Sequence, residues 1–111
     1  MLSNDWKEAL KDEPISIVKA DSLTGLLQFR VGELEKLITL RLSKKQGRNE
    51  FHYKISHAIG TPSQIGPYRS SIPYKTDEIS ALTFAVSGIT QYYEQAVKEG
   101  YQPEENWLVE Y

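Results

Sequence analysis

The stretch TDEISALTFAVSGITQYYEQAVKEG, residues 76–100, decides the fold of this chain. Its apolar residues recur at spacings of three and four, which predicts a helix with one wide apolar face. Thr76 is the expected N-cap, and Gly100 followed by Pro103 is the expected end of the helix. The apolar face comprises Ile79, Leu82, Ala85, Val86, Ile89, Tyr92, Tyr93, Ala96 and Val97.

A helix of this length must cover another layer, and the preceding residues have the pattern of a sheet. Apolar and polar residues alternate in segments rich in β-branched and aromatic side chains, which predicts strands over residues 15–20, 26–31, 37–43 and 50–59. A short helix is expected over residues 4–12, and Pro14 would end it. We therefore predict one α+β domain over residues 1–111, with an antiparallel sheet of about four strands, a short N-terminal helix, and a long C-terminal helix on one sheet face.

The alternation also predicts which side chains form the core. The sheet should contribute Leu27, Phe29, Val31, Ile38, Leu40, Leu42, Tyr53 and Ile55. These residues should pack against Ile79, Leu82, Val86, Ile89 and Tyr93 of the helix.

Two further segments have no such periodicity. Residues 60–75 form a loop rich in Pro, Gly and Ser, which is either a plain crossover to the helix or a functional loop. The tail, residues 101–111, alternates Trp107, Val109 and Tyr111, which predicts a last short strand or an aromatic cluster. Left exposed, this aromatic strip would favour a homodimer, which we expect.

The composition excludes several classes of protein. The 111 residues include no cysteine, so disulfides, thiolate metal sites and cysteine nucleophiles are excluded. The N-terminus lacks the pattern of a signal peptide, and no apolar run approaches the roughly 20 residues of a membrane span. We expect a cytoplasmic protein without a membrane partner.

The net charge of −2 conceals a segregation of charge along the chain. Residues 39–75 carry seven Lys and Arg against one acidic residue, whereas residues 76–111 carry one Lys against seven acidic residues. The two segments could neutralise each other locally, or the basic segment could be a surface for an anionic partner.

We predict a basic contact surface at the hairpin formed by residues 37–43 and 50–59. The expected contact residues are Arg41, Lys44, Lys45, Arg48 and Lys54. The partner would be a nucleic acid or an acidic protein. The alternative is that these cations only keep a sheet edge soluble.

Motifs of catalysis and of cofactor or metal binding are absent from the sequence. His52 and His57 are the only histidines, and five residues apart on one strand they would point to opposite faces. We interpret His57 as a half-buried, hydrogen-bonded sheet residue. The sequence therefore favours a non-enzymatic binding or regulatory module without cofactor or metal.

Two alternative functions remain open. A small-ligand-binding protein or minor enzyme would use the 60–75 loop, with His57, Tyr68, Arg69 and Ser70 as candidate anchors. In the simpler interpretation, Arg69 bonds loop carbonyls. A protein–protein adaptor would need none of these residues.

The element order loosely resembles two nucleic-acid-binding folds. The double-stranded-RNA-binding fold has lysines at the start of its last helix, but this chain has Asp77 and Glu78 there, which argues against that mode. The single-stranded-DNA-binding folds of the Whirly kind place four strands before a helix. Topology alone does not determine function.

Overall fold

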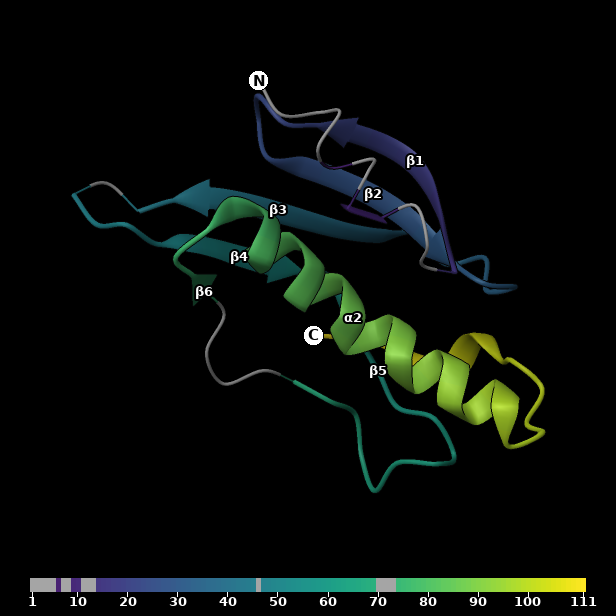
Figure 1. Cartoon of the computed structure of the whole chain (residues 1–111). Helices are drawn as coiled ribbons and strands as arrows, with labels where there is room; N and C mark the ends of the chain where they lie inside the picture. Colours follow the sequence, from purple (N-terminus) through teal and green to yellow (C-terminus); the bar gives the residue numbers. More distant parts are fainter. Residues whose placement is uncertain (1–5, 7–8, 11–13, 46, 70–73) are drawn as a thin grey trace.

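The computed structural model of this chain describes residues 6, 9, 10, 14–45, 47–69 and 74–111. Among these residues, five strands form an antiparallel sheet in the order β1-β2-β3-β4-β6, and helix α2 lies across one face (Figure 1). A smaller sheet pairs β5 with β7. The elements are β1 Ile15–Asp21, β2 Leu26–Val31, β3 Ile38–Lys44, β4 Phe51–Ile55, β5 His57–Ile59, β6 Tyr74–Lys75, α2 Glu78–Lys98, the 3₁₀ helix η1 Glu105–Trp107, and β7 Leu108–Glu110.

The α+β class is confirmed, and the large sheet has one strand more than the four predicted. The additional strand β6 lies at the end of the 60–75 loop, where Tyr74 pairs with His52 and Lys75 with Phe51. Two residues are too few to produce a periodic pattern, so the sequence does not reveal this strand.

The prediction of one continuous strand over residues 50–59 is wrong. Strand β4 ends at Ile55, and β5 begins at His57 in the other sheet. At the break, the Ser56 N–H donates to the Thr39 carbonyl at 2.9 Å, and the Thr39 N–H donates to the Ser56 hydroxyl at 2.9 Å. The Ser56 side chain therefore replaces a backbone acceptor and releases the following residues from β3.

The first helix predicted over residues 4–12 lies mostly outside the described residues; the three residues of it that are described, Trp6, Ala9 and Leu10, have helical conformation. Trp6 and Leu10 are described, and both are buried in the core. The Trp6 indole Nε1–H donates to the Glu78 carboxylate at 2.7 Å, which ties this segment to the start of α2.

The helix begins one residue later than predicted. Asp77, and not Thr76, is the N-cap, because its carboxylate accepts the Ser80 N–H at 2.8 Å. The C-terminal end follows the prediction: Gly100 has φ +98°, its N–H donates to Val97, and the Tyr101 N–H donates to Ala96. These two bonds form a Schellman motif, which needs the left-handed conformation that glycine adopts readily.

The cap predicts how stability depends on pH. Hydrogen bonds from the side chain and then the backbone of Ser80 lower the pKa of the Asp77 carboxyl. Because the folded state favours the ionised form, this contribution to stability is present above the unfolded-state pKa and is lost as the pH falls through the lower folded-state pKa. Asp77→Ala should therefore destabilise the protein near neutral pH, and its deficit relative to the natural chain should shrink as the pH falls through the lowered pKa of Asp77.

Chemical denaturation at several pH values measures this deficit. Asp77→Asn is the control that keeps an acceptor but removes the charge, so its deficit should be smaller. Thr76→Ala should have little effect. Equal losses for Thr76→Ala and Asp77→Ala, or a deficit independent of pH, would contradict the assignment of the cap.

The predicted core is present, with Ile55 and Ile79 half-buried at its margin. One predicted member of the helix face, Val97, is wrong, because it is 43 % exposed near the helix end. The core is also larger than predicted. It gains Trp6, Leu10, Leu34, Ile59, Ala81, Trp107 and Leu108.

The C-terminal tail packs against its own chain. Trp107 is buried, with its ring centre 5.9 Å from that of Tyr93, and β7 pairs with β5. The Glu105 carboxylate accepts the backbone N–H groups of Glu35 and Lys36 at 2.7 and 3.1 Å. Of the predicted strip, Trp107 is buried and Val109 is half-buried, and only Tyr111 is exposed, so the homodimer loses most of the observation on which it was predicted.

Candidate functional site

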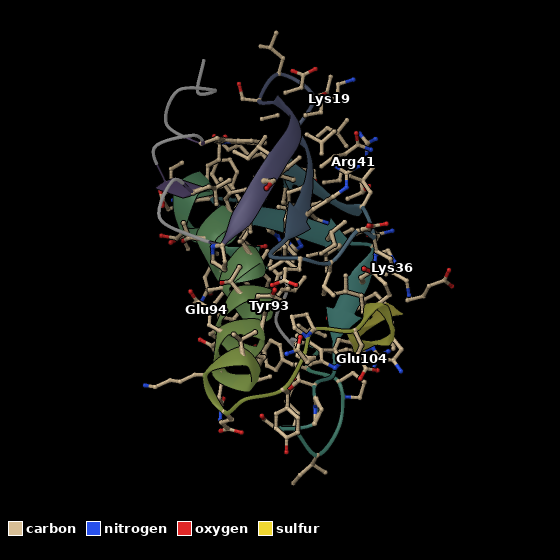
Figure 2. All side chains as sticks on the ribbon, turned by 90° about the vertical axis from the view of Figure 1, so that its right-hand side faces the viewer. Lys19, Lys36, Arg41, Tyr93, Glu94 and Glu104 are labelled. Atoms are coloured by element: carbon tan, nitrogen blue, oxygen red, sulfur yellow. The ribbon has the colours of Figure 1, made fainter. Side chains whose placement is uncertain are left out.

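The large sheet has one face covered by α2 and one face turned away from it, which we call the outer face. Leu42 and Tyr53 form a buried cross-strand pair, so their neighbours Arg41 and Lys54 point to the opposite side. Arg41 and Lys54 are themselves direct cross-strand partners, and both are exposed. Figure 2 shows Arg41 on the side of the sheet away from α2.

The same alternation places further cations on the outer face. Arg30 lies between the buried Phe29 and Val31 of β2 and is exposed. Lys19 of β1 pairs with Gln28, whose amide donates to the Thr39 hydroxyl at 3.4 Å. Lys19 is also on the Arg41 side in Figure 2. The outer face thus carries a cation on each of the strands β1, β2, β3 and β4.

An aromatic pair lies beside these cations. His52 faces outward two residues before Lys54, and it pairs across the sheet with Tyr74 of β6. Their ring centres are 4.9 Å apart with an angle of 23° between the planes, which is a stacked arrangement. Tyr74 is 36 % exposed at the sheet edge.

The cation pair of Arg41 and Lys54 and the imidazole of His52 border one depression on the protein surface. It has a volume of about 370 Å³ and is lined by Thr24, Arg41, Leu42, Ser43, His52, Tyr53 and Lys54. Its polar groups come from a cross-strand cation pair, a hydroxyl pair and an imidazole. The two cations can bind an anion through charge-assisted hydrogen bonds.

Acidic side chains near this depression are few. Glu50 contacts His52, with 3.0 Å between the carboxylate oxygen and Nε2. Asp21 lies at the end of β1, in a cross-strand row with Leu26 and Arg41, and its carboxylate accepts the Leu23 N–H at 3.0 Å. Within the described part of the chain, neither Arg41 nor Lys54 forms an ion pair.

The acidic helix does not neutralise the basic segment through ion pairs among the described residues. Glu94 of α2 lies on the side opposite Arg41 in Figure 2. Glu78 accepts from Trp6, and Glu99 accepts from Ser63 at 2.7 Å and Gln95 at 3.2 Å. The hydrogen bonds from Ser63 and Gln95 lower the pKa of the Glu99 carboxyl, and the Ser63 hydroxyl is the larger cause.

The five predicted contact residues do not share one surface. Arg41 and Lys54 lie together on the outer face, whereas the Lys44 ammonium lies 5.7 Å from the Phe51 ring, on the face that carries α2. Lys45 and Arg48 are exposed in the turn between β3 and β4, where the Arg48 N–H donates to the Lys45 carbonyl at 3.2 Å. The outer face therefore holds two of the five predicted contact residues, Arg41 and Lys54. It also holds Lys19 and Arg30, which were not predicted as contact residues.

The structure separates the candidates of the 60–75 loop. Tyr68 pairs with Ile59, and its ring lies 5.4 Å from that of Tyr92. A Cβ on Gly88 would lie 3.1 Å from the Tyr68 ring, so this glycine admits the loop against the helix. Ser70 lies outside the described residues.

Arg69 is occupied by the chain's own groups. Its guanidinium donates to the Glu110 carbonyl at 3.2 Å and lies 5.6 Å from the centre of the Tyr111 ring. Arg69 was interpreted as an arginine that bonds loop carbonyls; it does bond a main-chain carbonyl, but that of Glu110 in β7.

His57 is half-buried, with Nδ1 2.7 Å from the Ser56 hydroxyl, as the sequence predicted. Burial is the largest cause of its lowered pKa; Lys36 lowers the pKa further, and Glu110 opposes the shift. The cavity between His57, Tyr68 and α2 has a volume of about 20 Å³. That is room for about one water molecule, so it does not form a pocket for a small ligand.

The sequence alone could have indicated Arg30, because it alternates with Phe29 and Val31, which face the core. Lys19 follows a register shift in β1 and the exposed Val18, so simple alternation does not place it. The sequence carries no signal for Tyr74, because the register of β6 depends on contacts with a distant strand. His52 was noted, but not its stacking partner.

Comparisons of the chain with family models, with curated proteins and with solved structures found no match. Within the described residues, no group of three or more His, Cys, Asp or Glu side chains is placed to hold a metal ion. None of the described helices is long and apolar enough to cross a membrane. The function must therefore be argued from the geometry of the outer face.

Proposed function

We propose that this protein is a non-enzymatic binding module whose outer sheet face binds nucleic acid. The observation that carries the proposal is the exposed cross-strand pair Arg41 and Lys54, with no acidic partner among the described residues. Two cations directly opposite each other repel, which raises the free energy of the unbound protein. Adjoining phosphates bound at the two side chains would relieve this repulsion and accept hydrogen bonds from them.

The composition of the outer face favours nucleic acid over an acidic protein. Protein interfaces generally have an apolar centre with a polar rim. On the outer face, polar side chains point outward from the central strands, and the apolar Leu26 is already half-buried. Interfaces with nucleic acid are more polar and more positively charged, which fits this surface.

Removal of the cation pair should reduce both the affinity and its dependence on salt. Each phosphate contact contributes about 0.7 to the slope of log affinity against log salt for a single strand. Arg41→Gln together with Lys54→Gln should therefore reduce that slope by about 1.4 and weaken binding most strongly at low salt. Fluorescence anisotropy of a labelled oligothymidylate, titrated at several salt concentrations, measures both quantities.

Lys98→Gln is the matched control for the single variants Arg41→Gln and Lys54→Gln, because it also removes one exposed cation, from the last turn of α2. It should leave the salt slope unchanged. All three single variants should melt at the same temperature as the unsubstituted protein, because exposed charges contribute little to folding. Absence of oligonucleotide binding at low salt, or equal losses for Lys98→Gln and Arg41→Gln, would refute the proposal. Tighter binding to polyglutamate would identify an acidic protein instead.

Other candidate functions have less support. The small-ligand alternative needs a roomy pocket beside Tyr68 and Arg69, but the space there fits about one water. If the cations serve only to keep the sheet soluble, their replacement should promote aggregation without changing any binding. A pure adaptor would still bind its partner protein after the outer-face cations of this chain were replaced.

A further inference from the structure

The stacked pair of His52 and Tyr74 indicates which form of nucleic acid the outer face would take. Bases of a duplex are already stacked on each other, so an aromatic side chain can receive a base face only from an unpaired strand. Tyr74 is at the open edge of the sheet, stacked on His52 and still 36 % exposed. Such a ring offers area to a base at a small cost in conformational entropy, because its partner already holds it.

The charges around the pair specify where the base and the phosphate would lie. Glu50 contacts His52, so a carboxylate that repels phosphate lies beside the aromatic pair. Arg41 and Lys54 lie further along the outer face, with Lys54 two residues from His52 along β4. That separation is about 7 Å along a strand, within the reach of one nucleotide.

Resting on the function proposed above, we infer that the outer face binds single-stranded nucleic acid. A base stacks at Tyr74, and the adjoining phosphates contact Arg41 and Lys54. The imidazole of His52 supports the Tyr74 ring and is held by Glu50. Stacking is tolerant of sequence because every base has an aromatic face, so little preference among bases is expected.

The decisive experiment varies the ring and the bases separately. Tyr74→Ala should weaken binding of a labelled oligothymidylate by about 5- to 150-fold, the range for loss of one base–aromatic contact. Tyr74→Phe keeps the ring and should retain the affinity. Because stacking releases no counterions, Tyr74→Ala should have the same slope of log affinity against log salt as the unsubstituted protein. The double variant Arg41→Gln with Lys54→Gln should have a smaller slope.

An abasic oligonucleotide of the same length tests the inference on the natural protein, without reliance on the folding of a variant. It should bind more weakly than oligothymidylate, and a duplex of oligothymidylate with oligoadenylate should also bind more weakly. Equal affinity for the abasic strand or the duplex, with binding still sensitive to Arg41 and Lys54, would overturn the stacking and leave the proposed function intact. Failure of every nucleic acid to bind at low salt would overturn both.

Discussion

Leu82→Ala should lower the free energy of unfolding by about 2 to 5 kcal/mol, the range for truncation of a buried leucine. Leu82 is 0 % exposed and belongs to the face of α2 that packs on the sheet. The substitution removes apolar contacts and leaves a cavity that neighbouring side chains fill only partly. Most of the helix is held by this face, because packing, and not intrinsic propensity, stabilises a helix in a folded protein.

Urea denaturation followed by circular dichroism measures the loss. Val97→Ala is the control on the same helix, because Val97 is 43 % exposed and its truncation should cost less than about 0.5 kcal/mol. A loss below about 0.5 kcal/mol for Leu82→Ala would mean that the helix presents a different face to the sheet.

Gly25→Ala is expected to destabilise the protein by a similar amount, through the backbone. Gly25 has φ +76°, a conformation that costs a residue with a Cβ about 1 to 2 kcal/mol. A Cβ added at this position would also overlap the carbonyl oxygen of Leu42. The backbone N–H of Leu42 donates to the Gly25 carbonyl at 2.7 Å. Displacement of this buried bond should bring the total loss to about 2 to 5 kcal/mol.

Gly47→Ala separates these two causes. Gly47 has nearly the same backbone conformation, φ +79°, and nothing lies within 4 Å of its added Cβ. Gly47→Ala should therefore show only the conformational cost, and the difference between the two variants measures the overlap with Leu42. Equal losses would show that the contact between the β1–β2 turn and Leu42 of β3 yields to the added methyl group.

Part of the candidate site could be predicted from the sequence. Arg41 and Lys54 alternate with Leu42 and Tyr53, so local periodicity was sufficient to place both cations away from the helix. The same rule holds at Lys44, which shares the face of Leu42 and lies over Phe51 on the helix side, but the grouping of the hairpin-tip cations with Arg41 did not take this into account. The stacking of Tyr74 on His52 joins residues 22 positions apart through β6, and no local pattern marks it.

The sequence by itself determined the long helix, the inward side chains of β2, β3 and β4 and the segregation of charge. These features depend on periodicity, composition and end signals that act over a few neighbouring residues. Only the tertiary structure decided that the strand after Ser56 leaves the main sheet, that the tail returns to pair with it, and that β6 closes the sheet beside β4. Each of these pairings joins distant segments, and each is selected by how the whole chain buries its apolar surface and satisfies its backbone hydrogen bonds.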